Sequence, residues 1–317
     1  MSKETHSPSF LSHFTRLATM AMAVGGYYYY QNYTLGTTDY WVESPKYADG
    51  LEGMTIVQLA DLNFPNQKVP LDKIVSATAE ANPALIALTG NTIAPDGVFD
   101  HQELVHMINQ LVNIAPTFAI YGTNDIHSPL GRRAEQVMTD AGVHFLNDEA
   151  ITYEFHGTPI TVMGLMEKQN KRFLMNAPLE MITLTKEQQE QPKILLAHHP
   201  EAFRKYHYDP VKSPDLVLAG HAMGGGIRLP FVGPLYADQQ GYQPDYTDGV
   251  FGLPSDPYRT MVVSRGIGRP ASYVRINNRP EVVAVHLTAS VRSTSDSMVQ
   301  AIEDETRANG GWILDEE

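Results

Sequence analysis

Short apolar runs that stop at a polar residue recur along this chain, and they constrain its fold more than any other feature. Such runs occupy residues 54–60, 85–89, 118–121, 194–197 and 216–219, and each is followed by Asp, Gly or His. Buried strands have this length and composition, and polar or Gly-rich clusters end them. The runs therefore predict strands that deliver polar side chains to one edge of a sheet.

Helical patterns fill the intervals between the first of these runs. Apolar residues recur at helical spacing in residues 70–81, 101–113 and 131–141. Strands that alternate with helices of this length predict an α/β fold with parallel strands at its centre. Residues 151–155 and 159–165 instead predict a hairpin.

The remaining segments are polar or rich in turn residues. Residues 31–53 contain Pro45 and Gly50 and predict a linker into the first strand. Residues 236–257, rich in Gly, Pro, Asp and Tyr, predict a long loop. Residues 282–287 predict a closing strand near the end of the body.

Two of the strand ends carry histidine. His198 directly follows one apolar run, and His221 follows the next after a single Gly. Two imidazoles delivered by neighbouring strands are suited to a metal or phosphate site. The alternative is that each histidine caps its strand and bonds a nearby carbonyl group.

Taken in order, the strand ends resemble a known family. Asp61-Leu62-Asn63, Gly90-Asn91, Gly122-Thr123-Asn124-Asp125, His198 and Gly220-His221-Ala222-Met223 resemble the DxH, GD, GNHD, H and GHxH motifs of the calcineurin-like metallophosphoesterases. Flanking segments such as Ala-His-His-Pro resemble its membrane-anchored bacterial branch. The resemblance covers about residues 38–287. It implies an α/β fold, a four-layer sandwich of two mixed β-sheets flanked by helices, and the hydrolysis of phosphoric esters at two metal ions.

The resemblance also implies metal ligands. Asp61, His198 and His221 match the family's ligand pattern. Asn91 stands where the family has the bridging Asp, and Thr123 stands where it has Asn, so these two are expected to be weak ligands. The three matching residues, with Asn91 and Thr123, are the candidate metal site.

Three further positions depart from the pattern. Asn63 and Met223 replace family histidines that bind metal, and Asn124 replaces the histidine that protonates the leaving group. An amide cannot act as that acid. His127 and His199 lie near enough in sequence to substitute for it, but the simpler interpretation of each is structural.

A paired-metal centre holds its ions about 3.5–4 Å apart and needs a bridging carboxylate to offset their repulsion. Asn91 supplies no charge, and the thioether of Met223 is a soft ligand suited to copper. The first metal site is therefore expected to be lost. His198 and His221 with neutral oxygens either hold one divalent ion weakly (Zn, Mn or similar) or hydrogen-bond within a relict pocket without any metal.

A glycine turn, Gly224-Gly225-Gly226, follows the last of these motifs. Its N–H groups could cradle an anion. The interpretation we favour is that the glycines allow a tight exit from the strand.

The N-terminal segment bears on location. Lys3 and Arg16 precede an uncharged stretch, residues 17–30, which fits a signal anchor or a signal peptide better than a full membrane span. A buried helix is the alternative, but Gly25-Gly26 and the tyrosines that follow make a poor one. We expect attachment to the cell membrane with the body outside the cytoplasm, or secretion if the segment is cleaved.

The net charge bears on the possible partners, and the character of the segments predicts the domains. The net charge is −13, which argues against nucleic acid, and the chain has no cysteine. The expected domains are the N-terminal segment 1–35, a metallophosphoesterase-like body 36–290 and a polar tail 291–317.

Two functions follow as alternatives. The first is a catalytically impaired pseudoenzyme at the cell envelope that binds a small phosphate-containing ligand or a protein partner. The second is a divergent single-metal phosphoesterase that hydrolyses a phosphate ester of an envelope lipid or a nucleotide.

Overall fold

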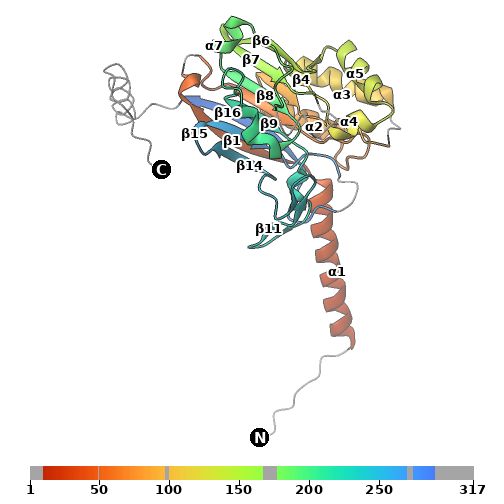
Figure 1. Ribbon diagram of the computed structural model, residues 1–317. Helices are drawn as coiled ribbons and strands as arrows, with labels where there is room; N and C mark the ends of the chain where they lie inside the picture. Colours follow the sequence, from red (N-terminus) through yellow and green to blue (C-terminus); the bar gives the residue numbers. More distant parts are fainter. Residues whose placement is uncertain (1–9, 49, 97–99, 167–176, 270–273, 290–317) are drawn as a thin grey trace, which may run out of the picture.

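The apolar runs of the sequence form the central strands of two stacked sheets (Figure 1). The strand order is β1-β16-β2-β3-β4-β5 in the first sheet and β14-β15-β9-β8-β7-β6 in the second. The protein is seen here in a computed structural model, which describes residues 10–48, 50–96, 100–166, 177–269 and 274–289.

In the first sheet the neighbouring strands run parallel, except that β16 and β2 are antiparallel. Its strands are β1 (Gly36–Ser44), β16 (Glu281–Ala289), β2 (Thr55–Leu59), β3 (Leu85–Leu88), β4 (Thr117–Ala119) and β5 (His144–Phe145).

The second sheet has a parallel centre and an antiparallel pair at each edge. Its strands are β14 (Gly249–Leu253), β15 (Asp256–Val263), β9 (Leu216–Ala219), β8 (Lys193–Ala197), β7 (Thr158–Gly164) and β6 (Glu149–Phe155). The edge pair β6–β7 is the hairpin that the sequence predicts.

Helices cover the outer faces of both sheets. On the first sheet they are α2 (Leu71–Glu80), α3 (His101–Ile114), α4 (Thr123–His127) and α5 (Gly131–Asp140); on the second they are α7 (Lys186–Glu190) and the 3-10 helix η2 (Pro200–His207). Two further 3-10 turns are η1 (Pro45–Tyr47) and η3 (Met223–Gly225).

Three apolar clusters fill the spaces between these layers. Ile56, Phe118 and Ile194 belong to the cluster between the two sheets, Ile108 to the one beneath the helices of the first sheet, and Phe203 to the one beneath η2. The layers are therefore helix, sheet, sheet and helix. The predicted four-layer α/β sandwich is confirmed.

Two segments predicted to be irregular contain strands. The expected linker 31–53 contains β1, which pairs over its whole length with β16. The expected loop 236–257 contains β14 and the short strands β12 (Tyr236–Ala237) and β13 (Gly241–Tyr242). Exposed and half-buried side chains dominate β1 and β14, so their sequences lack the apolar runs that mark the central strands.

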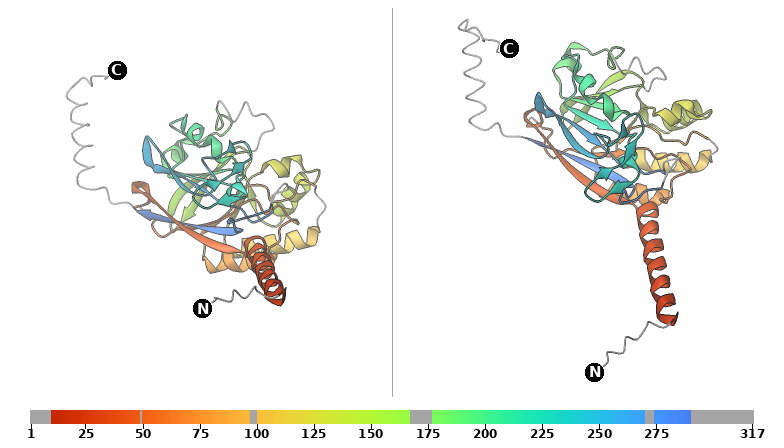
Figure 2. Two further views of the ribbon diagram at one scale, coloured as in Figure 1. Left: turned by 90° about the horizontal axis from the view of Figure 1, so that it is seen from below. Right: turned by 60° about the horizontal axis from the view of Figure 1, so that its bottom comes forward.

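The N-terminal segment forms a helix, α1 (Phe10–Tyr33), that projects from the body (Figures 1 and 2). The glycines at 25 and 26 do not interrupt it, and its tyrosines are exposed rather than buried. Within the described part of the chain, no helix combines the length and apolar character that crossing a bilayer requires. The domain boundaries at 35 and 290 stay predictions, and the tail 291–317 lies outside the described residues.

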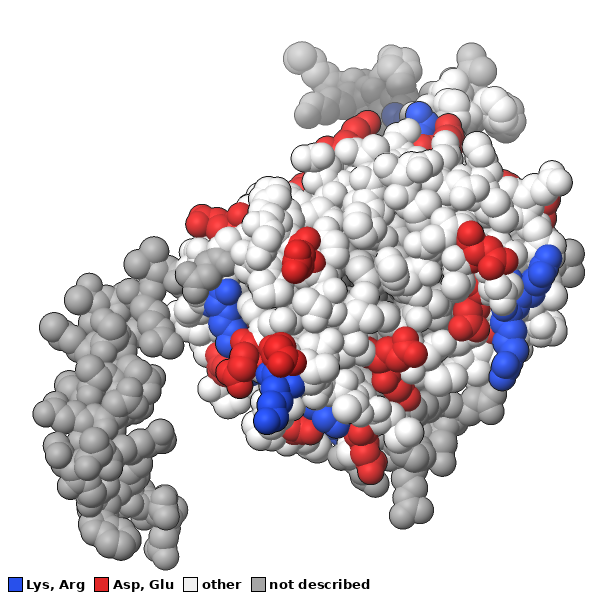
Figure 3. Space-filling view, turned by 90° about the horizontal axis from the view of Figure 1, so that it is seen from above, with Lys and Arg blue, Asp and Glu red and all other residues white. Residues whose placement is uncertain are grey.

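Hairpins lie beside α1 on the same side of the body (Figure 2). They comprise β12–β13 and the pair β10 (Arg228–Leu229) with β11 (Gly233–Pro234). The opposite face carries scattered acidic and basic side chains (Figure 3).

Candidate functional site

Strand ends from both sheets meet at one edge of the sandwich, where the sequence predicts the site. Nδ1 of His198, after β8, lies 2.9 Å from the carbonyl oxygen of Thr89, after β3. The backbone N–H of His221, after β9, donates to Oδ2 of Asp61, after β2, at 2.9 Å. The structure thus brings Asp61, His198 and His221 together.

Asp61 is fully buried and already supplied with hydrogen-bond donors. Besides the His221 N–H, the side-chain amide of Asn91 donates to its Oδ1 at 2.8 Å. Burial raises the pKa of Asp61, while His221 and the hydrogen bond from Asn91 oppose that rise. Both carboxylate oxygens face protein donors.

The three asparagines at this edge bond to one another. Nδ2 of Asn124 donates to Oδ1 of Asn63 at 2.7 Å, and the backbone N–H of Asn124 donates to Oδ1 of Asn91 at 2.7 Å. Nδ2 of Asn63 donates to the carbonyl oxygen of Asp61 at 3.3 Å. We call Asp61, Asn63, Asn91 and Asn124 the amide network. Its hydrogen bonds join the ends of β2 and β3 to the start of α4.

Thr123 directly precedes Asn124 in the chain, and Met223 follows His221 by two residues. Thr123 begins α4, and its Oγ1 is buried with no hydrogen-bond partner among the described residues. Nδ1 of His127 lies 2.6 Å from the carbonyl oxygen of Thr123, which agrees with a structural role for that histidine. The Met223 side chain is buried, and its carbonyl oxygen accepts from Asn278.

The backbone around the site is strained. Asp61, Asn63, Asn91, His221 and Met223 have φ of 49°, 49°, 53°, 65° and 46°. The left-handed region is costly for side chains other than Gly and Asn, and such residues cluster at functional sites. The chain therefore retains the backbone geometry of a ligand-binding edge although several ligand side chains are replaced.

A pair of metal ions does not fit these residues. Asp61 is the only carboxylate in the amide network, and its oxygens accept from Asn91 and His221. The oxygen of Asn91 accepts from Asn124 and carries no charge to hold two cations together. No reaction step through two metals can be derived from this arrangement.

The two histidines are joined in a chain of hydrogen bonds. Because a carbonyl oxygen only accepts, Nδ1 of His198 carries the hydrogen that points at Thr89. Nε2 of His198 can then accept from Nδ1 of His221, which lies 3.2 Å away. Burial, followed by the charges of His198 and His199, lowers the pKa of His221 to about 4.

This arrangement fixes the tautomer of His221. With its hydrogen on Nδ1, Nε2 presents a lone pair, and that atom is buried with no hydrogen-bond partner among the described residues. His221 therefore offers a neutral metal-binding nitrogen on the side away from His198.

Two further side chains lie close to the His221 imidazole. His199 and Glu201 join His221 in a cluster whose potential ligand atoms all lie within 4.8 Å of one another. Nδ1 of His199 lies 2.8 Å from Oε1 of Glu201. Burial would raise the pKa of Glu201, but the hydrogen bond and charge of His199 outweigh it, so this pKa is lowered.

Sequence reasoning assigned His199 a structural role and passed over Glu201. His199 lies in the Ala-His-His-Pro segment but at no ligand position of the motifs, and Glu201 lies outside them. The available signal was the sequence His199-Pro200-Glu201, in which a turn brings a carboxylate back beside an imidazole.

A pocket of about 460 Å³ borders the amide network. Asn63 and Asn124 line its inner side, and Lys68, Arg269 and Asp96 line its mouth. Two cations against one carboxylate give this opening a local positive balance, in contrast to the acidic chain as a whole.

The glycines of residues 224–226 allow a tight backbone turn. The N–H groups of Gly225 and Gly226 donate within the turn, to Ala222 at 2.8 Å and Met223 at 3.3 Å. Gly224 has φ +65°, and a Cβ there would lie 2.1 Å from Oδ1 of Asn278. The turn is a tight strand exit, as the sequence favoured.

The chain is similar in sequence to bacterial metallophosphoesterases. It is 28% identical over 286 residues to the uncharacterized metallophosphoesterase YkuE of Bacillus subtilis, across 87% of this chain and 95% of that relative. It is 28% identical over 251 residues to the phosphodiesterase YaeI of Escherichia coli, across 76% and 84%. These relatives support the metallophosphoesterase family.

No family model matches the chain. Among solved structures, the sulfate thiohydrolase SoxB of Thermus thermophilus aligns with it at a TM-score of 0.42 and 12% identity, over 81% of this chain and 61% of that one.

Proposed function

We propose that this chain is a metallophosphoesterase-family protein of the cell envelope that has lost two-metal hydrolysis and acts by binding a phosphate-containing ligand or a protein partner. One observation carries the proposal: the 2.8 Å hydrogen bond from the Asn91 amide to the buried Asp61 carboxylate. Where a two-metal enzyme needs a shared negative charge, this chain has a neutral donor.

The pocket beside the amide network supports ligand binding. Lys68 and Arg269 stand at its mouth, and the amide groups of Asn63 and Asn124 stand at its inner side. Cations and amide donors together suit an anionic group such as a phosphate ester.

A single-metal phosphoesterase is the second candidate. The unpartnered Nε2 of His221 favours it, as does the phosphodiesterase name of the Escherichia coli relative. An ester of an envelope lipid or a nucleotide would be its substrate.

Metal content and hydrolysis, measured on the same preparation, separate the candidates. Full-length protein purified without chelator is analysed for bound metals and assayed with bis(p-nitrophenyl) phosphate and added Mn²⁺ or Zn²⁺. We expect fewer than two metal equivalents per chain and hydrolysis at background. Metal-dependent turnover that His221→Ala abolishes would establish the single-metal hydrolase instead.

A restoring variant tests the same proposal from the other direction. Asn63→His, Asn91→Asp, Thr123→Asn, Asn124→His and Met223→His together return the family ligands and acid. We expect metal content to rise toward two equivalents and hydrolysis to become measurable. Asn113→Asp adds the same charge as Asn91→Asp at an exposed position of α3 and should leave both quantities unchanged.

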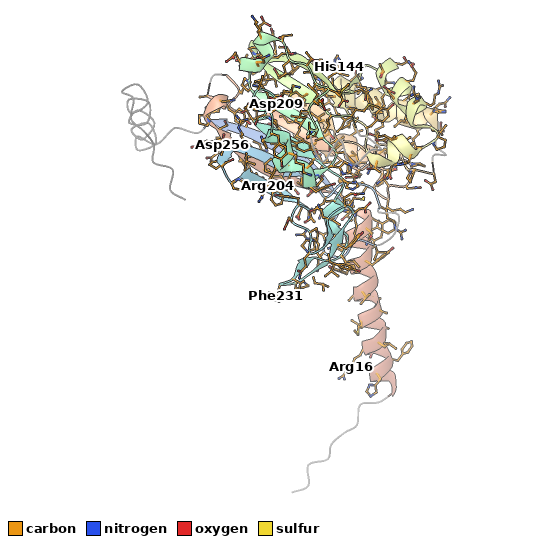
Figure 4. The ribbon with its side chains drawn as sticks, viewed as in Figure 1. Arg16, His144, Arg204, Asp209, Phe231 and Asp256 are labelled. Carbon is orange, nitrogen blue, oxygen red and sulfur yellow. The ribbon has the colours of Figure 1, made fainter. Side chains whose placement is uncertain are left out.

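We also propose that α1 attaches the protein to a membrane, with the body outside the cytoplasm. Leu17, Met20 and Val24 are 68%, 66% and 61% exposed, which leaves apolar surface without protein cover. Phe231, at the tip of the β10–β11 hairpin, is fully exposed on the same side of the body (Figure 4). Exposed aromatic and aliphatic groups on one side suit a lipid surface.

Vesicle flotation tests the attachment. The full chain should float with phosphatidylglycerol-containing vesicles, and deletion of residues 1–24 should abolish flotation. Phe231→Ser should weaken flotation while leaving α1 intact. If the deleted chain floats as well as the full chain, α1 is not the attachment.

A further inference from the structure

We propose that one divalent transition-metal ion of the zinc class binds between His199, Glu201 and His221, displaced from the family's paired site. Only His221 of these three matches a family ligand position. The inference concerns metal binding alone and holds whether or not the chain hydrolyses an ester.

The first argument is that two buried acceptor atoms of the cluster lack a hydrogen-bond donor among the described residues. Nε2 of His221 is buried and has no hydrogen-bond partner among the described residues, and the same is true of Oε2 of Glu201. Leaving buried acceptors without a donor costs free energy, and a carboxylate costs more than a neutral group. A cation between them resolves both at once.

The second argument is spacing. The potential ligand atoms of the three side chains lie within 4.8 Å of one another. Zinc binds His nitrogen and carboxylate oxygen at about 2.0–2.2 Å in a tetrahedral arrangement, so two ligand atoms on one ion lie about 3.5 Å apart. Side-chain rotation that brings the three atoms to this spacing would let them share an ion.

The third argument is the support behind each ligand. The chain from Thr89 through His198 fixes the hydrogen of His221 on Nδ1 and aims Nε2 outward, at 2.9 Å and 3.2 Å. The hydroxyl of Tyr206 donates to the backbone carbonyl oxygen of His199 at 2.7 Å, which holds the backbone that carries that ring. Metal-binding histidines typically donate the hydrogen of their other ring nitrogen to a fixed acceptor, as His221 does to His198.

The ligand set indicates the class of metal. Two imidazoles and one carboxylate form the set that hydrolytic zinc sites use, with a fourth position open. Mg²⁺ and Ca²⁺ prefer oxygen ligands and would be held poorly here. The site therefore selects Zn²⁺, Co²⁺ or a similar ion.

The alternative is that Glu201 forms only an ion pair with His199, at 2.8 Å, and that no metal enters. In that case the two buried acceptors stay without partners.

Metal titration of the chelator-treated full chain tests the proposal. Zn²⁺ affinity is measured by dye competition, and Co²⁺ binding by the visible absorption of a four-coordinate ion. We expect one equivalent per chain and a melting temperature that rises until that equivalent is bound. Glu201→Gln, which keeps the size of the side chain, should weaken Zn²⁺ at least ten-fold.

Two controls locate the site. Glu187→Gln makes the same change at an exposed position and should leave affinity unchanged. Asp61→Asn removes the carboxylate of the amide network, and at the proposed site it should alter affinity by less than three-fold. Binding lost in Asp61→Asn but kept in Glu201→Gln would place the ion at the family position and overturn the proposal. If neither a Co²⁺ spectrum nor a Zn²⁺-dependent change in melting temperature is seen, the proposal is wrong and Glu201 forms only the ion pair with His199.

Discussion

The side chain of Asn91 determines whether the buried carboxylate of Asp61 needs a cation. With an amide at position 91, Asp61 receives a hydrogen bond at 2.8 Å and needs no cation. A carboxylate at position 91 would place two negative charges at that distance in a buried site. Such a pair either shares a proton or captures a metal ion.

Asn91→Asp should therefore make stability depend on metal. We expect the metal-free variant to lose on the order of 3 kcal/mol of unfolding free energy, because a buried charge is left uncompensated. Added Mn²⁺ or Zn²⁺ should recover much of that loss. Urea unfolding with EDTA and with metal measures both. A variant as stable as the parent in EDTA would show that Asp61 is not the group that Asn91 satisfies.

At this scale the sequence marks the asparagines but not the cluster beside them. Asn63, Asn91 and Asn124 stand at positions of motifs in the resemblance, and at position 91 an amide where the resemblance implies a carboxylate could be seen directly. Glu201 stands in no motif, and its approach to His221 depends on how η2 turns back after β8. Side-chain proximity of that kind is set by tertiary packing.

The C-terminal end of α1 is built into the body. The Asn32 side chain exchanges two hydrogen bonds with the backbone of Arg275, both at 3.0 Å, and Oε1 of Gln31 accepts from the N–H of Asn278 at 2.8 Å. Asn278 in turn donates to the carbonyl oxygens of Met223 and Gly226. The helix thus supports the turn that follows His221.

The place of truncation should consequently matter. Deletion of residues 1–24 removes only projecting helix, and we expect it to leave the stability of the body unchanged. Deletion of residues 1–35 also removes Gln31 and Asn32, whose three hydrogen bonds should together be worth about 3 kcal/mol at about 1 kcal/mol each. The more exposed bonds of Tyr27, Tyr30 and Leu35 with Asn277 and Arg279 are lost as well, so about 3 kcal/mol is the least we expect. Thermal unfolding of the two truncated chains provides the comparison. Equal melting temperatures would show that these contacts add nothing.

The central strands, the helices and the β6–β7 hairpin were predictable, and the edge strands β1 and β14 were not. The run 194–197 and the buried strand β8 (Lys193–Ala197) nearly coincide, because a strand buried on both faces must be continuously apolar. β1 has mostly exposed or half-buried side chains and finds its partner β16 at the other end of the chain. Nothing local in its sequence identifies that pairing.

For the molecule as a whole, buried ionisable groups determine how the free energy of unfolding changes as pH falls. Burial and the charge of Arg259 lower the pKa of His207 to about 4, and burial lowers that of His221 to about 4. Their stabilising contributions are complete above pH of about 6.5 and are lost as pH falls toward 4. Burial raises the pKa of Asp125 to about 6, so its protonation favours the folded state over much of the same window and opposes that loss.

A substitution at His207 measures one of these contributions separately, because His207 is not part of the candidate metal site. His207 is the last residue of η2, and its Nδ1 lies 2.8 Å from Oγ of Ser213. In His207→Gln, the free energy of unfolding should fall less between pH 7 and pH 4.5 than in the parent. We expect a difference of about 1–2 kcal/mol, because partial exposure screens the full effect of the pKa shift.

Urea unfolding of both proteins at a series of pH values measures the difference. His106→Gln makes the same change at an exposed position of α3 and should follow the parent at every pH. The contribution of Asp125 protonation to the free energy of unfolding is the same in all three proteins, so it cancels in the comparison. Parallel curves for His207→Gln and the parent would mean that His207 accepts its proton as readily folded as unfolded, and that burial beside Arg259 does not govern its charge.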